Sequence, residues 1–166
     1  MTPMERLPFR QWADTFRTKE FISVEPRSGY RMALREDDSR PIYLTPDATD
    51  VALGHALLEA LDKSRFIWPP DEPEFFEWQR YIRRERDWHK EFMDRFSYKT
   101  KREAYRNMNW CRIQRSEGRI SIEPHKRRDQ PEHWKWLPQD QTVSIPDSRD
   151  TAAVGAALRL ALDRCE

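Results

Sequence analysis

The chain has 166 residues, of which 37% are hydrophobic and 36% are charged, and its formal net charge is +1. This length suits one compact domain, or one domain built of two half-units. The near-neutral charge argues against bulk binding to nucleic acid or to a membrane surface. Aromatic residues make up 12% of the chain and apolar residues recur periodically, which argues against disorder.

No export or membrane segment is expected. The first eleven residues mix charge with proline, and no apolar run approaches membrane-spanning length. Cys111 and Cys165 are too few for a disulfide framework and too far apart in sequence for a metal knuckle. We therefore expect a cytoplasmic protein with free thiols, without metal or cofactor.

Residues 12–65 predict a first unit of four strands and a helix. The second strand contains Ile22 and Val24, which alternate with polar residues and therefore share one face. Pro26 is expected to end this strand, because proline has no N–H to donate. The four strands are expected near residues 12–17, 22–25, 30–34 and 42–44.

Apolar residues recur at helical spacing from residue 53 to 61 and again from 154 to 162, which predicts a closing helix in each half. Gly54 and Gly155 occupy matching places and suggest close backbone packing. Candidate N-caps are Asp47 or Thr49 for the first helix, and Asp147 or Ser148 for the second.

Residues 66–109 predict a helical connector. A helix is expected from residue 74 to about residue 96, and its apolar stripe is expected to pack on the body of the protein. Lys99, Lys101 and Arg102 follow in a short basic run beside Tyr98, a weak signal for nucleic acid. The stripe comprises Phe75, Trp78, Tyr81, Ile82, Trp88, Phe92 and Phe96.

Residues 110–166 repeat the first unit. Residues 12–26 align without a gap on residues 110–124 with six identities in fifteen positions, and the matches resume towards the ends of both units. We therefore predict an α+β fold of two duplicated ββββα units in a Whirly-like pseudo-twofold arrangement, within a single domain spanning residues 1–166.

The sequence contains few residue patterns that are typical of catalytic sites. The four histidines show no metal-ligand spacing, and neither a phosphate-binding glycine loop nor a nucleophile motif is present. Glu25 and Glu123 occupy equivalent places and could form a carboxylate dyad, but solvated glutamates at strand ends are the expected interpretation. The sequence therefore does not predict an enzyme.

Two stretches, residues 96–124 and 145–165, resemble immunity proteins of bacterial contact-dependent growth inhibition (CDI) systems. The loop at residues 126–136 departs from this resemblance. The motifs that carry it are Tyr98-Lys99-Thr100-Lys101-Arg102, Asn107-Met108, the Ile-Ser-Ile-Glu-Pro strand of residues 120–124, and Gly155-Ala156-Ala157-Leu158-Arg159.

The resemblance implies a cytosolic protein that binds the C-terminal toxin domain of a delivered effector one-to-one. Such toxins are most often nucleases, and the immunity protein itself performs no chemistry. Apart from the toxin, a monomer or weak dimer without membrane association is expected. A duplicated ββββα plan also resembles the Whirly fold, whose members bind single-stranded nucleic acid, so this function remains the alternative.

The toxin-binding surface is predicted from charge. Residues 12–65 carry 8 Lys/Arg and 10 Asp/Glu, whereas residues 110–166 carry 10 and 9. An acidic surface complements the basic cleft that a nuclease needs for phosphates. The alternative contact is the tryptophan loop of the second unit. The candidate interface residues are Glu36, Asp37, Asp38, Asp71, Glu72, Glu74, Trp134 and Trp136.

Overall fold

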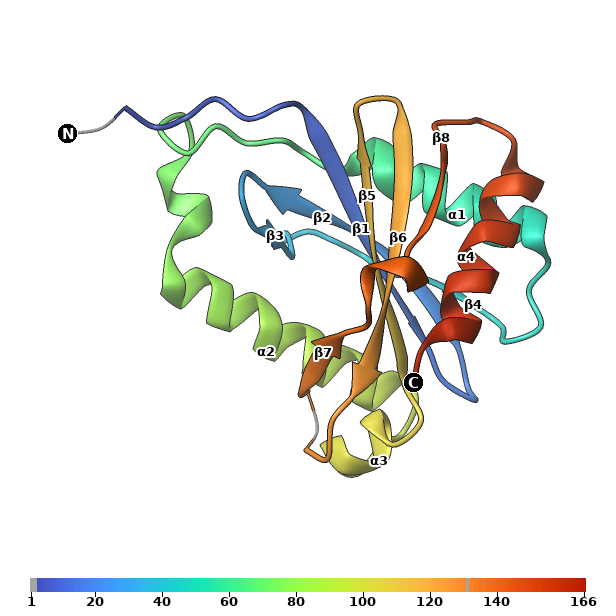
Figure 1. The fold of residues 1–166 in the computed structure, drawn as a ribbon. Helices are drawn as coiled ribbons and strands as arrows, with labels where there is room; N and C mark the ends of the chain where they lie inside the picture. The colour runs from blue at the N-terminus through green and yellow to red at the C-terminus, as the bar shows by residue number, and fades with distance from the viewer. Residues whose placement is uncertain (1–2, 131) are drawn as a thin grey trace.

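The computed structural model describes residues 3–130 and 132–166 and has the predicted α+β class. Both halves show four strands followed by a helix, with further helices between them (Figure 1). In chain order the elements are β1 (Arg10–Arg17), β2 (Ile22–Gly29), β3 (Ala33–Leu34), β4 (Ile42–Leu44), α1 (Asp50–Lys63), a 3-10 helix (Pro73–Phe76), α2 (Trp78–Arg95), α3 (Lys101–Tyr105), β5 (Asn109–Ser116), β6 (Arg119–Arg127), β7 (Trp134–Trp136), a 3-10 helix (Gln139–Gln141), β8 (Val143–Pro146) and α4 (Thr151–Arg164).

The eight strands pair antiparallel in one sheet of order β3-β2-β1-β5-β6-β7. β4 also pairs with β2, and β8 also pairs with β6. The β1–β5 pair therefore lies at the centre of the sheet. The two strands pair over all of their residues and so join the two halves of the chain. The β5–β6 hairpin turns through Glu117 and Gly118, both at positive φ, as a two-residue hairpin turn of this kind requires.

The prediction that proline ends the second strand of each half is wrong. Pro26 lies inside β2 and Pro124 lies inside β6. Each proline marks the point where the strand changes its outer neighbour: β4 pairs up to Val24 and β3 pairs from Ser28. Because the register leaves Pro26 no outer partner, the missing N–H costs the ladder little.

Helices α1 and α4 cover one face of the sheet and enclose the main core with apolar residues of the long strands (Figure 1). The two helices touch at their glycines. A Cβ on Gly54 would lie 1.8 Å from the Thr151 carbonyl oxygen, and one on Gly155 would lie 1.7 Å from the Asp50 carbonyl oxygen. The predicted close packing at these two positions is therefore confirmed.

The connector crosses the other face of the sheet. α2 starts at Trp78 rather than at residue 74, because Pro73 opens a separate 3-10 turn and Glu77 is extended. A short helix that the sequence analysis did not predict, α3, follows with Thr100 as its N-cap. A second apolar cluster joins these helices to the sheet; it comprises Phe16, Phe21, Trp88, Phe92, Ala104, Tyr105 and Met108.

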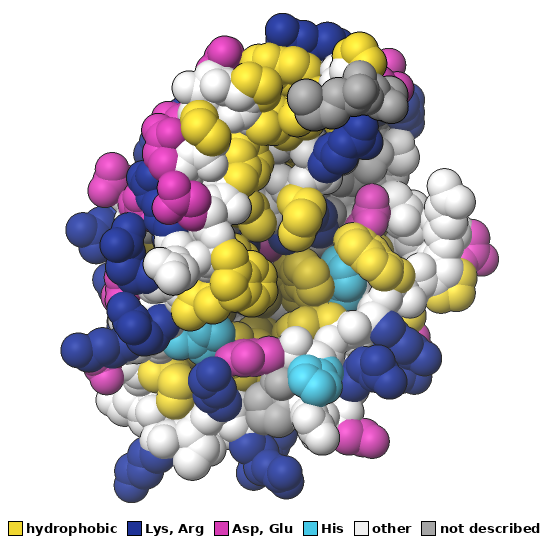
Figure 2. Space-filling model, turned by 90° about the vertical axis from the view of Figure 1, so that its left-hand side faces the viewer, with side chains coloured by type: hydrophobic (Ala, Val, Ile, Leu, Met, Phe, Trp, Pro, Cys, Tyr) yellow, Lys and Arg dark blue, Asp and Glu magenta, His cyan; other side chains and the backbone are white. Residues whose placement is uncertain are grey.

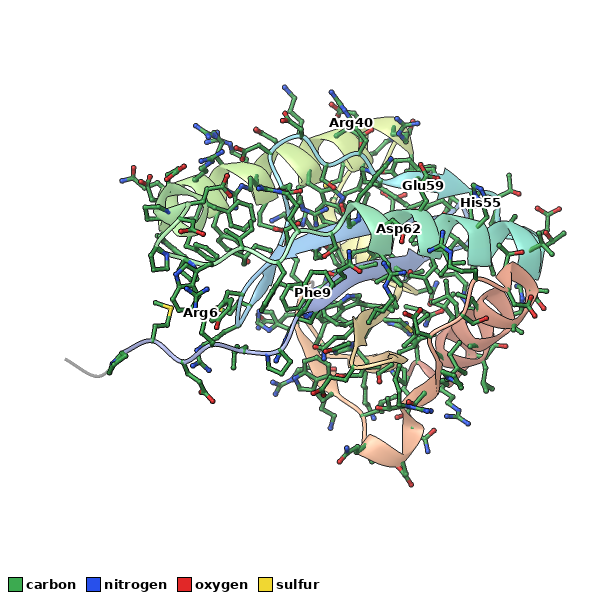
Figure 3. All side chains as sticks on the ribbon, turned by 90° about the horizontal axis from the view of Figure 1, so that it is seen from above. Arg6, Phe9, Arg40, His55, Glu59 and Asp62 are labelled. Atoms are coloured by element: carbon green, nitrogen blue, oxygen red, sulfur yellow. The ribbon has the colours of Figure 1, made fainter. Side chains whose placement is uncertain are left out.

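Two further details complete the frame. Thr49 caps α1 as predicted, whereas Asp150 caps α4 in place of Asp147 or Ser148. The N-terminal segment carrying Arg6 and Phe9 runs past the sheet before entering β1 (Figure 3), and the Arg6 guanidinium lies 3.6 Å from the Trp68 ring centroid. Within the described residues, no helix is both long and apolar enough to cross a membrane.

Candidate functional site

A groove of about 480 Å³ lies between α2 and the sheet face that α1 and α4 leave uncovered. Viewed from the side of α2, the surface is hollowed, and hydrophobic side chains gather around the hollow (Figure 2). We call it the α2 groove. Its lining includes Asp14, Phe16, Arg27, Met32, Leu34, Arg35, Tyr81, Ile82, Glu85, Trp88, His89, Tyr105, Trp110, Arg112, Glu132 and Trp134.

Asp14 anchors an ion-pair network in this groove. Its carboxylate is completely buried and accepts two hydrogen bonds from Arg112, at 2.7 Å from Nε and 2.9 Å from Nη2. Arg27 Nε lies 3.0 Å from Asp14 Oδ2 on the other side. One carboxylate on β1 therefore holds guanidinium groups from β2 and β5, a geometry that two-pronged arginines favour.

The network continues towards α2. Arg27 Nη2 lies 3.2 Å from Glu25 Oε1, and Arg35 pairs with the same carboxylate. Arg35 Nε also lies 3.3 Å from Glu85 Oε1 on α2 and its guanidinium is 4.0 Å from the Trp88 ring centroid. Charges from three strand segments and a helix are thus fixed relative to one another.

The interpretation of Glu25 and Glu123 as solvated residues is wrong for Glu25, which is buried. Period two places Glu25 and Arg27 on the face that α2 covers, so a polar strand face becomes interior. Glu123 is half-buried, and burial raises the pKa of its carboxyl despite the opposing charge of Arg112. The two glutamates therefore occupy different environments.

Electrostatics within the network favour the charged forms. Burial alone would raise the pKa of the Asp14 carboxyl, but Arg112 and Arg27 outweigh burial and hold this pKa well below its usual range. Burial likewise opposes ionisation of Glu85, while Arg35 and Arg27 lower its pKa. Asp14 and Glu85 are therefore ionised at neutral pH.

An aromatic stack borders the groove on the side of β7. The His125 ring lies between Trp110, at 3.8 Å between centroids, and Trp136, at 4.1 Å. Burial lowers the pKa of His125 to about 4. Trp134 lines the groove and meets Trp110 edge-on, whereas Trp136 is 57% exposed. The structure therefore brings the two predicted tryptophans to one side of the groove.

The predicted acidic surface is largely paired with arginines. Asp37 binds Arg80 and Arg84, with Arg84 Nε at 2.6 Å, and Arg84 is buried. Glu36 and Glu72 both pair with Arg65. These three acids therefore present less free negative charge than the sequence suggests, because guanidinium groups of the same chain already pair with them.

The remaining predicted acids, Asp38, Asp71 and Glu74, are exposed and form no ion pair among residues 3–130 and 132–166. Asp71 and Glu74 lie ahead of α2, where the chain passes through its first 3-10 turn. A pocket of about 320 Å³ beside Asp37 also contains Arg40, Arg83 and Arg95, so the surface there is mixed in charge.

The groove offers contacts that the chain does not use. Met32 is 67% exposed and Ile82 is 45% exposed on its rim. Trp110 Nε1 is a buried donor without a partner among the described residues. In folded proteins most buried donors form a hydrogen bond. Exposed apolar residues around fixed charges suit a macromolecular partner. In the part of the chain described, no cluster of three His, Cys, Asp or Glu could hold a metal ion.

The sequence analysis missed the charged centre of the groove, although a signal for it exists. Asp14 lies directly opposite Arg112 in the β1–β5 register, and opposite Glu25 in the β1–β2 register. All three alternate with core residues along their strands, which places them on one face. Recognising the cluster requires knowing that β1 pairs with a strand nearly a hundred residues later.

Comparisons with known proteins agree with one another. Residues 11–165 match the family model CdiI, described as CDI immunity protein. The immunity protein CdiI-YPIII of Yersinia pseudotuberculosis serotype O:3 (strain YPIII) is 31% identical over 170 residues, covering 93% of this chain and 95% of that protein.

Two solved structures share the fold. A chain in the CdiA-CT/CdiI toxin and immunity complex from Yersinia pseudotuberculosis has a TM-score of 0.88 and 29% identity, covering 95% of this chain and 98% of that chain. A protein of unknown function from Neisseria meningitidis also has a TM-score of 0.88, with 25% identity, covering 99% of this chain and 100% of that chain.

Proposed function

Because the chain belongs to the CDI immunity protein family, as its resemblance predicted, we propose that it binds and neutralises the C-terminal toxin domain of its cognate CDI effector. The observation that carries this proposal is the similarity, over 95% of the chain, to a protein in a CdiA-CT/CdiI toxin and immunity complex. We further propose a one-to-one complex, a nuclease toxin, cytoplasmic action and no catalysis by the immunity protein itself.

We propose that the α2 groove and its rim form the toxin-binding surface. Its fixed charges provide directional contacts without a large ordering cost, because the ion pairs already hold the side chains in place. Met32 and Ile82 supply exposed apolar area beside them. We place the predicted contacts Trp134 and Trp136 on the same surface. Asp38 is one of three predicted acids that are exposed and unpaired among the described residues, and it is the one we choose for a test.

The decisive experiment replaces exposed apolar residues on the two faces of the molecule and measures how each variant binds the toxin domain. Met32→Glu and Ile82→Glu are expected to weaken binding at least tenfold by calorimetry and to abolish protection of cells that express the toxin domain. Val51→Glu and Leu160→Glu are the matched controls, because these residues are 54% and 46% exposed on α1 and α4, across the sheet. All four substitutions should leave the fold intact, since the side chains are exposed.

Light scattering of the purified mixture should also give a one-to-one mass. Loss of binding in Val51→Glu or Leu160→Glu, with full binding in the groove variants, would move the interface to the helical face. If all four variants bind the toxin fully, neither pair of apolar residues is essential for binding. Toxin binding by Asp38→Lys and Trp136→Ala would then be measured. Failure of the wild-type chain to bind or protect against its cognate toxin would overturn the proposed function.

Single-strand nucleic-acid binding is the second candidate, and one observation favours it. Arg102, Arg106, Arg127 and Arg128 surround a pocket of about 260 Å³ at the end of the molecule that carries α3. Phosphates bound there would make affinity fall steeply with salt. We expect only weak binding of a fluorescent oligonucleotide, because Lys101 already pairs with Glu132 at 2.8 Å. Tight binding at physiological salt would favour this function.

We also infer that residues 12–65 and 110–166 are copies of one unit, joined by the connector of residues 66–109 within a single domain. The repeated sequence supports this, as does the pairing pattern, in which β2 and β6 each contact one inner and two outer strands. Superposition of an experimental structure should place Trp12 on Trp110 and Gly54 on Gly155. The likeness to the Whirly fold stays a prediction.

A further inference from the structure

The two cysteines of the chain, 54 residues apart, meet where α4 ends. Cys111 lies on β5 and is completely buried, whereas Cys165 is the C-cap of α4 and is half-buried. Their sulfur atoms are 3.6 Å apart. Cys165 Sγ also lies 3.4 Å from the carbonyl oxygen of Trp110, so its side chain is held facing β5.

We propose that this thiol pair is a modification site, at which a hydroperoxide converts Cys111 and Cys165 to an intramolecular disulfide. Bond formation needs the two sulfur atoms to approach by about 1.5 Å, to a bond length of about 2.05 Å. Cys165 can supply this movement because it follows the last turn of α4, where the backbone leaves the helix in an extended conformation. This inference does not depend on the proposed toxin-binding function.

The roles of the two thiols follow from their surroundings. Cys111 S–H can donate to Cys165, and this hydrogen bond lowers the pKa of Cys165 to about 7 despite partial burial. Burial raises the pKa of Cys111. Cys165 is therefore the thiolate that reacts first, and Cys111 is the thiol that resolves the product.

The reaction balances with hydrogen peroxide as the oxidant. The Cys165 thiolate attacks one peroxide oxygen, the O–O bond breaks, and the departing hydroxide takes up a proton to leave as water. This step gives a sulfenic acid on Cys165. The Cys111 sulfur then attacks the Cys165 sulfur, the S–O bond breaks, and the Cys111 proton leaves with the hydroxide as a second water.

The disulfide would fix residues 165 and 166 against the sheet. The Glu166 N–H donates to the His125 carbonyl at 3.2 Å, and the Arg127 N–H donates to the Glu166 carbonyl at 2.8 Å. Residues 165 and 166 therefore lie along β6, next to the aromatic stack that borders the groove. Because the bond closes a long loop, from residue 111 to residue 165, it should raise the thermal unfolding temperature.

The test exposes the purified full-length chain to increasing hydrogen peroxide, followed by denaturation, alkylation and intact mass spectrometry without reductant. Wild type should lose both thiols together, lose two hydrogens in mass, stay monomeric, melt at a higher temperature and recover fully with dithiothreitol. In Cys111→Ser and Cys111→Ala, the sulfenic acid on Cys165 should persist and react with dimedone. Cys165→Ser should leave Cys111 unoxidised in the folded protein.

Two results would overturn the proposal. One is accumulation of sulfinic or sulfonic acid on Cys165 while Cys111 keeps its thiol, which would show that the sulfurs cannot approach. The other is a disulfide found only between two chains. The wild-type measurement decides between these outcomes even if the Cys111 variants do not fold.

Discussion

At the scale of single residues, Asp14 is a fully buried carboxylate that pairs with two arginines. Asp14→Asn is expected to lower the free energy of unfolding by about 3 kcal/mol, because it leaves the buried Arg27 and the half-buried Arg112 beside a neutral group. Urea denaturation followed by tryptophan fluorescence measures this change. Asp38→Asn is the control and should stay within about 0.5 kcal/mol of wild type, since Asp38 is exposed. Equal stability of the two variants would contradict the role given to the network.

His125 makes stability depend on pH. Its pKa is about 4 in the folded protein and about 6.5 in an unfolded chain, so between these values the unfolded state binds more protons. Stability should therefore rise as pH increases from about 4 to 6.5, by up to about 3 kcal/mol for this residue. Below pH 4 both states are protonated and the contribution levels off.

The variant His125→Phe isolates this effect, because phenylalanine can keep the stack between Trp110 and Trp136 without titrating. The unfolding free energy of the variant should vary less with pH across the window than that of wild type. Subtracting the stability curve of the variant from that of wild type cancels the contributions of other titrating groups. These include His89 and Glu123, whose pKa values burial also shifts. Parallel curves would show that His125 is not held neutral by the fold.

At the scale of secondary-structure elements, the contact between α1 and α4 depends on two glycines. Gly54→Ala would normally favour a helix, but here its methyl group would overlap the backbone of the other helix at Thr151. We expect a loss of about 2–3 kcal/mol in the free energy of unfolding, measured by chemical denaturation. Val51→Ala, on the exposed side of α1, should be neutral or slightly stabilising.

Each glycine faces the backbone of the other helix. The losses in free energy of unfolding caused by Gly54→Ala and Gly155→Ala should therefore not be additive in the double variant. Once one methyl group has separated the helices, the second costs less. Full additivity would mean that each helix adjusts locally without changing the distance between them.

The elements that the sequence predicted well are those whose signal is local. Alternation at Ile22 and Val24 identified β2, and the apolar stripes identified α1 and α4, because periodicity reports which side faces a core. α3 was missed because five residues are too few to show a helical period. The end of β2 was misplaced because the place of Pro26 depends on which outer strands pair on each side of it.

At the scale of the whole molecule, the charged groove could not be predicted from local patterns. Asp14 and Arg112 come from different halves, and only the β1–β5 register makes them neighbours. Glu36 and Asp37 looked free in the sequence because their partners, Arg65, Arg80 and Arg84, lie far along the chain. Charge counted along the sequence thus overstated the acidity of the folded surface.

The central pairing of β1 with β5 also sets when the protein can become functional during its synthesis. Arg10 pairs with Ser116, so β1 lacks its inner neighbour until most of the chain has left the ribosome. Before then the nascent chain exposes an unpaired strand edge, and neither α1 nor the α2 groove has its complete set of contacts. Pairings between distant residues form slowly. A newly made chain therefore gains its native groove only after translation is nearly complete, and a product truncated before β5 cannot form it.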